Sequence, residues 1–263
     1  MPDNRTDIAV IGAGAAGCFC AIEIRRAHPE LSVSLFEAGR APMAKLALTG
    51  GGRCNLTNTF AGVRNLSEVY PRGERLMKRA LKEFGPEETM RWFEREGIRL
   101  VVQDDECVFP QSQDAMQIVR VLENLILRTG VELACNKKVI SISPLPQDGS
   151  PESGFSLSFS DGGQVGANKV VFAIGGCSSS ALESILPQWV ELVRTVPSLY
   201  TFKIADESLR ALMGTVVPRV GLSLVGTSFR AEGILLLTDW GVSGPATRRL
   251  SSYAARHLAE GGY

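Results

Sequence analysis

The chain has 263 residues, 44% of them hydrophobic, and its 28 Lys and Arg residues balance its 28 Asp and Glu residues. This length can bury one large core or two smaller ones. The zero net charge gives no electrostatic footprint for nucleic acid or an anionic membrane surface, so neither is expected as a partner.

The distribution of cysteines and histidines argues against a metal site. Six cysteines are scattered without a C-x-x-C pair, and the chain has two histidines. This pattern is typical of reduced thiols in a cytoplasmic protein. The polar N-terminus runs directly into an apolar, strand-like segment, which predicts a cytoplasmic location without a signal peptide.

The first half of the chain predicts alternating strands and helices. Residues 7–12 form a continuous apolar run, typical of a strand buried on both faces. A helix over 15–27, a second strand over 32–38 and a Gly-rich loop extending to residue 58 follow.

Two helical regions come next. Residues 73–96 have helical spacing and are interrupted by Pro86, which predicts that a second helix starts there. Residues 112–130 predict another helix, with Ser112 as N-cap and Gly130 as its C-terminal stop.

Three β-like runs, 131–145, 154–161 and 164–176, predict an antiparallel meander whose last strand returns to the parallel sheet. After Pro187, short strands precede a helix from about 245 to 259. We therefore expect an α/β fold: a Rossmann-type domain with a β-meander over 1–189 and part of an inserted β-rich domain over 190–263.

The strongest motif is Gly12-Ala13-Gly14-Ala15-Ala16-Gly17, a G-x-G-x-x-G sequence between a strand and a helix. Its glycines permit a tight turn, close approach of a pyrophosphate and close helix packing. Glu37 ends the second strand at the spacing expected of a ribose-binding carboxylate. The motif alone does not distinguish NAD from FAD. The helices and meander that follow favour FAD, as in glutathione-reductase-type flavoproteins.

Several longer segments carry a family resemblance. "DIAVIGAGAAG", "KLALTGGGRCNLTN", "VFPQS", "VVFAIGG", "VPSLYTF" and "DWGVSGPA" occur in this order. Together they resemble the BaiN-like NAD(P)/FAD-dependent oxidoreductases, a group that includes aminoacetone oxidase-type flavoenzymes. The resemblance covers nearly the whole chain.

The motifs and the resemblance together imply a set of FAD-binding residues. Gly51 and Gly52 would bring backbone N–H groups to the cofactor, Arg53 would offset pyrophosphate charge, and Lys45 would be a second cation. Cys54 could be redox-active or a packing residue, and the absence of a paired cysteine favours packing. The full set is Gly12, Ala13, Gly14, Ala15, Ala16, Gly17, Glu37, Ala38, Lys45, Thr49, Gly51, Gly52, Arg53, Cys54, Asn55, Val139, Ala173, Gly175 and Gly176.

The expected function is FAD-dependent transfer of a hydride or electron pair between a small organic substrate and flavin. NAD(P)H or dioxygen would be the other partner, and no catalytic acid or base stands out. Members of the family continue past the point where this chain stops and return to the flavin domain, so the resemblance implies a C-terminally truncated chain. The alternative is a truncated, non-catalytic binding module that keeps the fold.

Overall fold

The computed structural model describes residues 5–145, 154–193 and 195–261, and the chain divides into two compact units. The first comprises Met1–Arg64 and Lys78–Leu192, and the second comprises Asn65–Met77 and Val193–Tyr263. The sequence prediction placed one boundary between 189 and 190 and did not assign residues 65–77 to the second unit.

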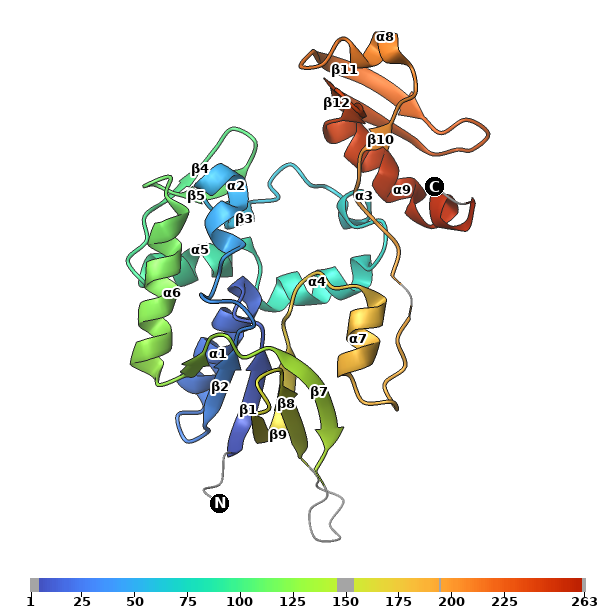
Figure 1. Ribbon diagram of the computed structural model, residues 1–263. Coiled ribbons are helices and arrows are strands. Elements are labelled where there is room, and N and C mark those ends of the chain that lie inside the picture. The colour runs from blue at the N-terminus through green and yellow to red at the C-terminus, as the bar shows by residue number, and fades with distance from the viewer. Residues whose placement is uncertain (1–4, 146–153, 194, 262–263) are drawn as a thin grey trace. The chain divides into compact units, whose positions relative to one another are not determined.

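A six-stranded sheet forms the centre of the first unit (Figure 1). Its order is β6-β2-β1-β9-β8-β7; the first four strands run parallel, and β8 and β7 are antiparallel additions. The strands are β1 (Arg5–Ile11), β2 (Val33–Phe36), β6 (Glu132–Ala134), β7 (Val139–Pro144), β8 (Phe155–Phe159) and β9 (Gln164–Phe172).

The apolar run of β1 is buried on both faces, as predicted. Ile8 and Val10 belong to one hydrophobic cluster, whereas Ala9 and Ile11 belong to a second cluster on the opposite face. Alternate residues of a strand point to opposite faces, so one short segment contributes to two cores. The predicted return of the last β-run to the parallel sheet is also confirmed, because β9 pairs with β1 in parallel.

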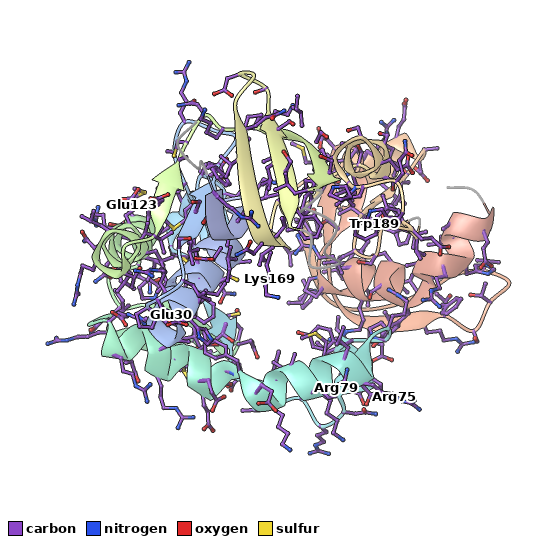
Figure 2. All side chains as sticks on the ribbon, turned by 90° about the horizontal axis from the view of Figure 1, so that it is seen from below. Glu30, Arg75, Arg79, Glu123, Lys169 and Trp189 are labelled. Atoms are coloured by element: carbon purple, nitrogen blue, oxygen red, sulfur yellow. The ribbon has the colours of Figure 1, made fainter. Side chains whose placement is uncertain are left out.

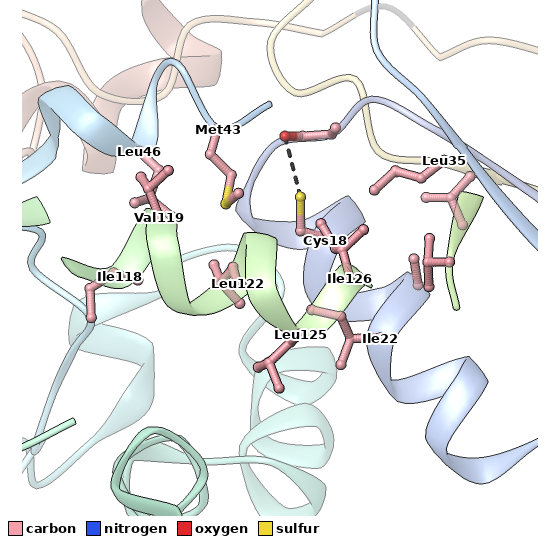
Figure 3. Close-up of a cluster of buried hydrophobic side chains, with 14 of the residues drawn as sticks. Cys18, Ile22, Leu35, Met43, Leu46, Ile118, Val119, Leu122, Leu125 and Ile126 are labelled. Carbon is pink, nitrogen blue, oxygen red and sulfur yellow. Dashed lines mark hydrogen bonds between the residues drawn. The ribbon is translucent and has the colours of Figure 1, made fainter. Parts of the chain in front are cut away.

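Helices α1 (Ala15–Ala27) and α6 (Ala115–Thr129) contribute apolar side chains to the first cluster. Figure 3 shows Cys18 and Ile22 of α1 close to Leu122 and Ile126 of α6. These residues recur at the spacing that places side chains on one helical face.

The predicted C-terminal stop of α6 is confirmed, because Gly130 adopts a left-handed conformation with φ 73°. The predicted N-cap is wrong. Asp114, not Ser112, caps the helix, and its Oδ1 accepts a hydrogen bond from the Met116 N–H at 2.8 Å. Ser112 instead bonds the side chain of Gln117.

Replacing the observed cap should destabilise the protein more than replacing the predicted one. We expect Asp114→Ala to lower the free energy of unfolding by about 1 kcal/mol, because a first-turn N–H loses its acceptor. Ser112→Ala, at an exposed position, should change it by less than about 0.5 kcal/mol. Chemical denaturation of both variants measures the difference, and equal losses would contradict the assignment of the cap.

The predicted meander is correct for β7, β8 and β9 but not for the start of its first run. Residues 131–145 divide into β6, parallel to β2, and β7, antiparallel to β8. The chain leaves the sheet between them, where Asn136 has φ 56°. The N–H groups of Asn136 and Lys137 bond the carbonyls of Gly39 and Glu37, so this turn packs on the loop after β2.

The first unit contains further short elements, among them those of the Gly-rich loop, and α4 (Glu74–Glu83) lies partly in each unit because the division falls between Met77 and Lys78. A small sheet has the order β3-β5-β4, and Pro86 opens a helix as predicted. The elements are η1 (Leu46–Leu48), α2 (Thr49–Gly52), β3 (Thr57–Asn58), α4 (Glu74–Glu83), α5 (Pro86–Arg95), β4 (Leu100–Val102), β5 (Cys107–Pro110) and α7 (Ser179–Ile185).

The second unit consists of a four-stranded sheet and a long helix, in agreement with the predicted short strands and terminal helix. Its sheet order is β10-β13-β12-β11, and α9 packs on β11 and β12. The Tyr253 hydroxyl donates to the Glu68 carbonyl at 3.2 Å, which ties segment 65–77 to this unit. The elements are α3 (Leu66–Val69), β10 (Phe202–Lys203), α8 (Glu207–Arg210), β11 (Val216–Ser223), β12 (Arg230–Thr238), β13 (Gly241–Ser243) and α9 (Pro245–Gly261).

In the described parts of the chain, no helix combines the length and apolar character that crossing a membrane requires.

Candidate cofactor site

The turn between β1 and α1 is built by backbone packing that only glycine allows. Gly12 has φ +99°, and a Cβ there would lie 2.6 Å from the Ala173 carbonyl oxygen. A Cβ on Gly17 would lie 1.9 Å from the Gly12 carbonyl oxygen, whereas a Cβ on Gly14 would meet no atom within 4 Å. The first and third glycines therefore serve packing, and the second leaves open space beside the backbone.

Helix α1 starts at this turn without a cap. No side chain accepts a hydrogen bond from its first turn, and the first turn holds no acidic residue. The free N–H groups and the positive end of the helix dipole favour an anion. This is the local arrangement that holds a pyrophosphate in nucleotide-binding folds.

Glu37 and Met43 brace the turn from two sides. The Glu37 carboxylate accepts hydrogen bonds from the Ala13 N–H at 2.9 Å and the Gly39 N–H at 2.7 Å. The Met43 N–H bonds the Ala13 carbonyl at 2.7 Å. Each carboxylate oxygen can accept a second hydrogen bond, so the predicted ribose contact of Glu37 is compatible with this brace.

A cavity of about 740 Å³ opens beside the turn, within the range typical of small-molecule and cofactor sites. It brings together residues that are far apart in the sequence, from the β1 turn, the Gly-rich loop and the end of β9. The predicted residues that line it are Gly12, Ala13, Gly14, Ala15, Ala16, Glu37, Lys45, Thr49, Cys54, Asn55, Ala173 and Gly175.

Other predicted residues do not line this cavity. Gly17 packs behind the turn, and Val139 is buried in the cluster on the opposite face of the sheet. Ala38 and Gly176 are exposed. The structure therefore places these residues around the turn and the sheet rather than on the cavity wall.

The three glycines of the Gly-rich loop have a conformational role. Gly50, Gly51 and Gly52 have φ of 57°, 69° and 82°, a region that side chains other than glycine rarely adopt. A Cβ on Gly50 would lie 2.8 Å from the Asn55 nitrogen, whereas Gly51 and Gly52 face open space. The left-handed turn brings Cys54 and Asn55 to the cavity, whereas Gly51 and Gly52 do not line it. Their predicted contact with the cofactor stays a prediction.

Arg53 points to neighbours outside the cavity. Its guanidinium carbon lies 4.3 Å from the centre of the Phe109 ring, and its side chain donates to the Gly50 carbonyl and the Gln113 side chain. These contacts fasten the loop to β5 and the turn that follows it. Lys45 is the cation that lines the cavity, and it forms no ion pair within the described parts of the chain.

Cys54 is a buried cysteine that lines the cavity. Its side chain is 3% exposed, and burial raises the pKa of the thiol above its usual value, although a hydrogen bond with Thr49 acts in the opposite direction. Burial likewise raises the pKa of the Cys18 thiol to about 12. A reactive cysteine needs a thiolate, so the geometry favours the packing role over a redox role.

The sequence analysis missed the apolar part of the cavity wall. No motif marks these residues, because they have the composition of ordinary core and enter the wall only through tertiary packing. They are Phe19, Ala41, Met43, Ala44, Leu46, Leu56, Phe84, Phe93, Leu122 and Ile174, together with the polar Thr89. In the described residues, no group of His, Cys, Asp and Glu could hold a metal ion.

Comparisons with known proteins agree with this geometry. Residues 6–197 match the family described as HI0933-like protein Rossmann domain, and residues 196–263 match the HI0933-like protein barrel and H2TH domain. The chain is similar to the ribosomal RNA dihydrouridine synthase of Escherichia coli, with 32% identity over 95% of this chain and 61% of that protein. It is also similar to the 3-dehydro-bile acid delta(4,6)-reductase of Clostridium scindens, with 27% identity over 97% of this chain and 62% of that protein.

The chain thus spans about three fifths of the length of these curated relatives. Among solved structures, Thermovibrio ammonificans THI4 is similar over 80% of this chain and 72% of that chain, with 12% identity and a TM-score of 0.47.

Proposed function

Because this chain belongs to the HI0933-like family of flavoproteins, we propose that it reduces a carbon–carbon double bond conjugated to a carbonyl group. FAD would be its cofactor and NAD(P)H the source of the hydride. The first unit is a Rossmann-type FAD-binding domain, which supports the cofactor assignment. The class of substrate and the use of NAD(P)H as hydride donor belong to the proposal.

The names of two relatives support this reaction class. One makes dihydrouridine in ribosomal RNA, and the other reduces delta(4,6) bonds of a 3-dehydro bile acid. The reduced bond of uridine is conjugated to a ring carbonyl, and a 3-oxo group conjugates with double bonds at positions 4 and 6. Both substrates can therefore accept hydride at one carbon of the conjugated double bond. The negative charge then develops on the other carbon of that bond, where the carbonyl delocalises it and where a proton adds.

The observation that carries the proposal is the cavity beside the uncapped N-terminus of α1. Its residues fit FAD: the helix start and Lys45 suit a pyrophosphate, and Glu37 suits ribose hydroxyl groups. Bound FAD supplies two-electron hydride chemistry. The chain itself contributes the apolar wall, including Met43, Leu46 and Phe93, which would limit the access of water to a bound flavin.

The experiment is an anaerobic assay of the purified protein. We expect visible flavin absorbance, or its recovery after added FAD, and oxidation of NAD(P)H that depends on a conjugated enone or on uridine-containing RNA. Mass spectrometry should show a product that has gained two hydrogens. The matched saturated compound should not support turnover.

Two results would contradict the proposal. One is a colourless protein that added FAD does not restore. The other is a flavoprotein that oxidises NAD(P)H with dioxygen but leaves every conjugated substrate unchanged.

A further inference from the structure

A second cavity, of about 250 Å³, lies in the first unit on the face of the central sheet opposite to α1 and α6. Its volume is below the roughly 300 Å³ at which drug-sized sites begin, so it suits a small metabolite. None of its lining residues lines the cofactor cavity. They are Arg5, Thr6, Ser34, Phe36, Glu132, Leu133, Ala134, Lys137, Phe159, Gly163, Gln164 and Val165.

One side of this cavity carries a carboxylate, that of Glu132 on β6. Ser34 lies beside Glu132 in the register of β2 and β6, and its hydroxyl donates to the Glu132 carboxylate at 3.1 Å. Ser34 is 6% exposed, so the carboxylate is oriented by a buried group. Within the described residues Glu132 forms no ion pair. An oriented carboxylate without an ion-pair partner is suited to binding a protonated amine.

Two cations supply charge of the opposite sign. Lys137 lies in the turn between β6 and β7, where its ammonium group pairs with the Asp161 carboxylate and lies 5.5 Å from the centre of the Phe159 ring. An ammonium group has three donors, so this pair leaves donors for a carboxylate of a ligand. Arg5, at the start of β1, bonds the Asn168 side chain at 2.7 Å and adds a second positive charge to the wall.

An aromatic pair forms the apolar part of the wall. The ring centres of Phe36 and Phe159 lie 4.9 Å apart, and the two side chains are 5% and 2% exposed. Leu133, Ala134 and Val165 extend this apolar surface. An apolar group of a ligand would displace water from it, which is favourable.

The charges of the wall restrict the class of ligand. A simple anion would meet the negative charge of Glu132, and a simple cation would meet the positive charges of Arg5 and Lys137. A small zwitterion with an apolar group presents one charge of each sign and also fits the aromatic pair. A free amino acid has this combination of groups.

We propose that this cavity binds a free α-amino acid with an apolar side chain. Glu132 binds the ammonium group of the ligand, Lys137 binds its carboxylate, and the Phe36 and Phe159 rings contact its side chain. The site lies apart from the cofactor cavity, so this proposal does not depend on the proposed flavin chemistry.

The first test is isothermal titration calorimetry of the full chain with L-leucine and with L-phenylalanine. We expect at least one of them to bind at a single site. N-acetyl-L-leucine or N-acetyl-L-phenylalanine lacks the ammonium group, and L-leucinamide or L-phenylalaninamide lacks the carboxylate. Each derivative should bind about tenfold more weakly or worse than its parent amino acid, because one charge-assisted contact is lost. L-glutamate, whose charged side chain would meet the aromatic pair, should also bind more weakly.

The second test locates the site with matched variants. Glu132→Gln and Lys137→Gln should each weaken binding of the amino acid by about tenfold or more. Glu123→Gln and Lys169→Gln are the controls, because both side chains are exposed in the same unit and neither lines this cavity. Figure 2 labels these two control residues, on α6 and β9. Circular dichroism establishes that all four variants are folded.

Several outcomes would overturn the proposal. The first is the absence of binding by both L-leucine and L-phenylalanine. The second is equal affinity for a parent amino acid and either of its derivatives, a comparison that leaves the protein unaltered and so does not depend on the folding of a variant. The third is binding that survives both Glu132→Gln and Lys137→Gln, or that falls equally in the controls, since either result would place the amino acid elsewhere.

Discussion

A Gly17→Ala variant is expected to lose both stability and flavin. The new Cβ would lie 1.9 Å from the Gly12 carbonyl oxygen and 3.3 Å from the Ala173 side chain, so either α1 or the turn must move. Alanine normally stabilises a helix by about 1 kcal/mol relative to glycine, so a net loss would come from the clash. We expect the free energy of unfolding to fall by about 3 kcal/mol or more.

Gly14→Ala is the matched control, because its Cβ would meet no atom within 4 Å and its φ of −78° suits any residue. This variant should keep the stability of the apo-protein but bind FAD more weakly, because the methyl group enters the space beside the helix start. Thermal unfolding and flavin titration measure both quantities. A Gly17→Ala protein with unchanged unfolding temperature would show that the close contact is not a constraint on the fold.

Local patterns predicted the sheet core and the turn because each of these features depends on residues close in sequence. The apolar run of residues 7–12, the glycines at 12, 14 and 17 and the carboxylate at 37 together define a strand–turn–helix unit and the strand beside it. The structure places Glu37 against the Ala13 N–H, beside the turn, whereas the ribose contact that the spacing predicts stays a prediction. A binding role that depends on backbone geometry can therefore be predicted where the residues involved lie this close in the sequence.

The Gly-rich loop could not be predicted because its conformation depends on distant partners. Arg53 lies over Phe109 and bonds Gln113, sixty residues away, so its charge is directed to the fold rather than to the cavity. The glycines of the loop adopt positive φ. From the sequence, a glycine needed for positive φ looks the same as a glycine needed for the close approach of a ligand. Glycine alone does not tell these two causes apart.

The helix cap and the domain boundary show the same limit. Ser112 and Asp114 are both good N-cap residues, and the choice depends on where the preceding turn places the backbone. Segment 65–77 belongs to the second unit, where Tyr253, far along the chain, bonds its backbone. Neither outcome follows from periodicity or propensity.

The second large effect is expected at Glu37. In the apo-protein its carboxylate holds the Ala13 and Gly39 N–H groups, so it joins the glycine turn to the loop after β2. Glu37→Ala removes both acceptors, and hydrogen bonds to a charged group contribute about 1.5–3 kcal/mol each. We expect a less stable apo-protein and an FAD dissociation constant raised by about 10- to 100-fold.

Glu37→Gln separates the brace from the ligand contact, because a carboxamide keeps one acceptor oxygen but loses the charge and the second acceptor. It should retain part of the apo-protein stability that Glu37→Ala loses. If Glu37 also binds ribose hydroxyl groups, the glutamine variant should still bind FAD more weakly than its stability loss explains. Glu30→Ala, at an exposed carboxylate in the same unit, is the control and should change neither quantity. An unchanged FAD dissociation constant in Glu37→Ala would show that Glu37 does not bind the cofactor and has only a structural role in the turn. A weaker affinity for FAD without any loss of apo-protein stability would show the opposite, that Glu37 binds the cofactor but does not stabilise the turn.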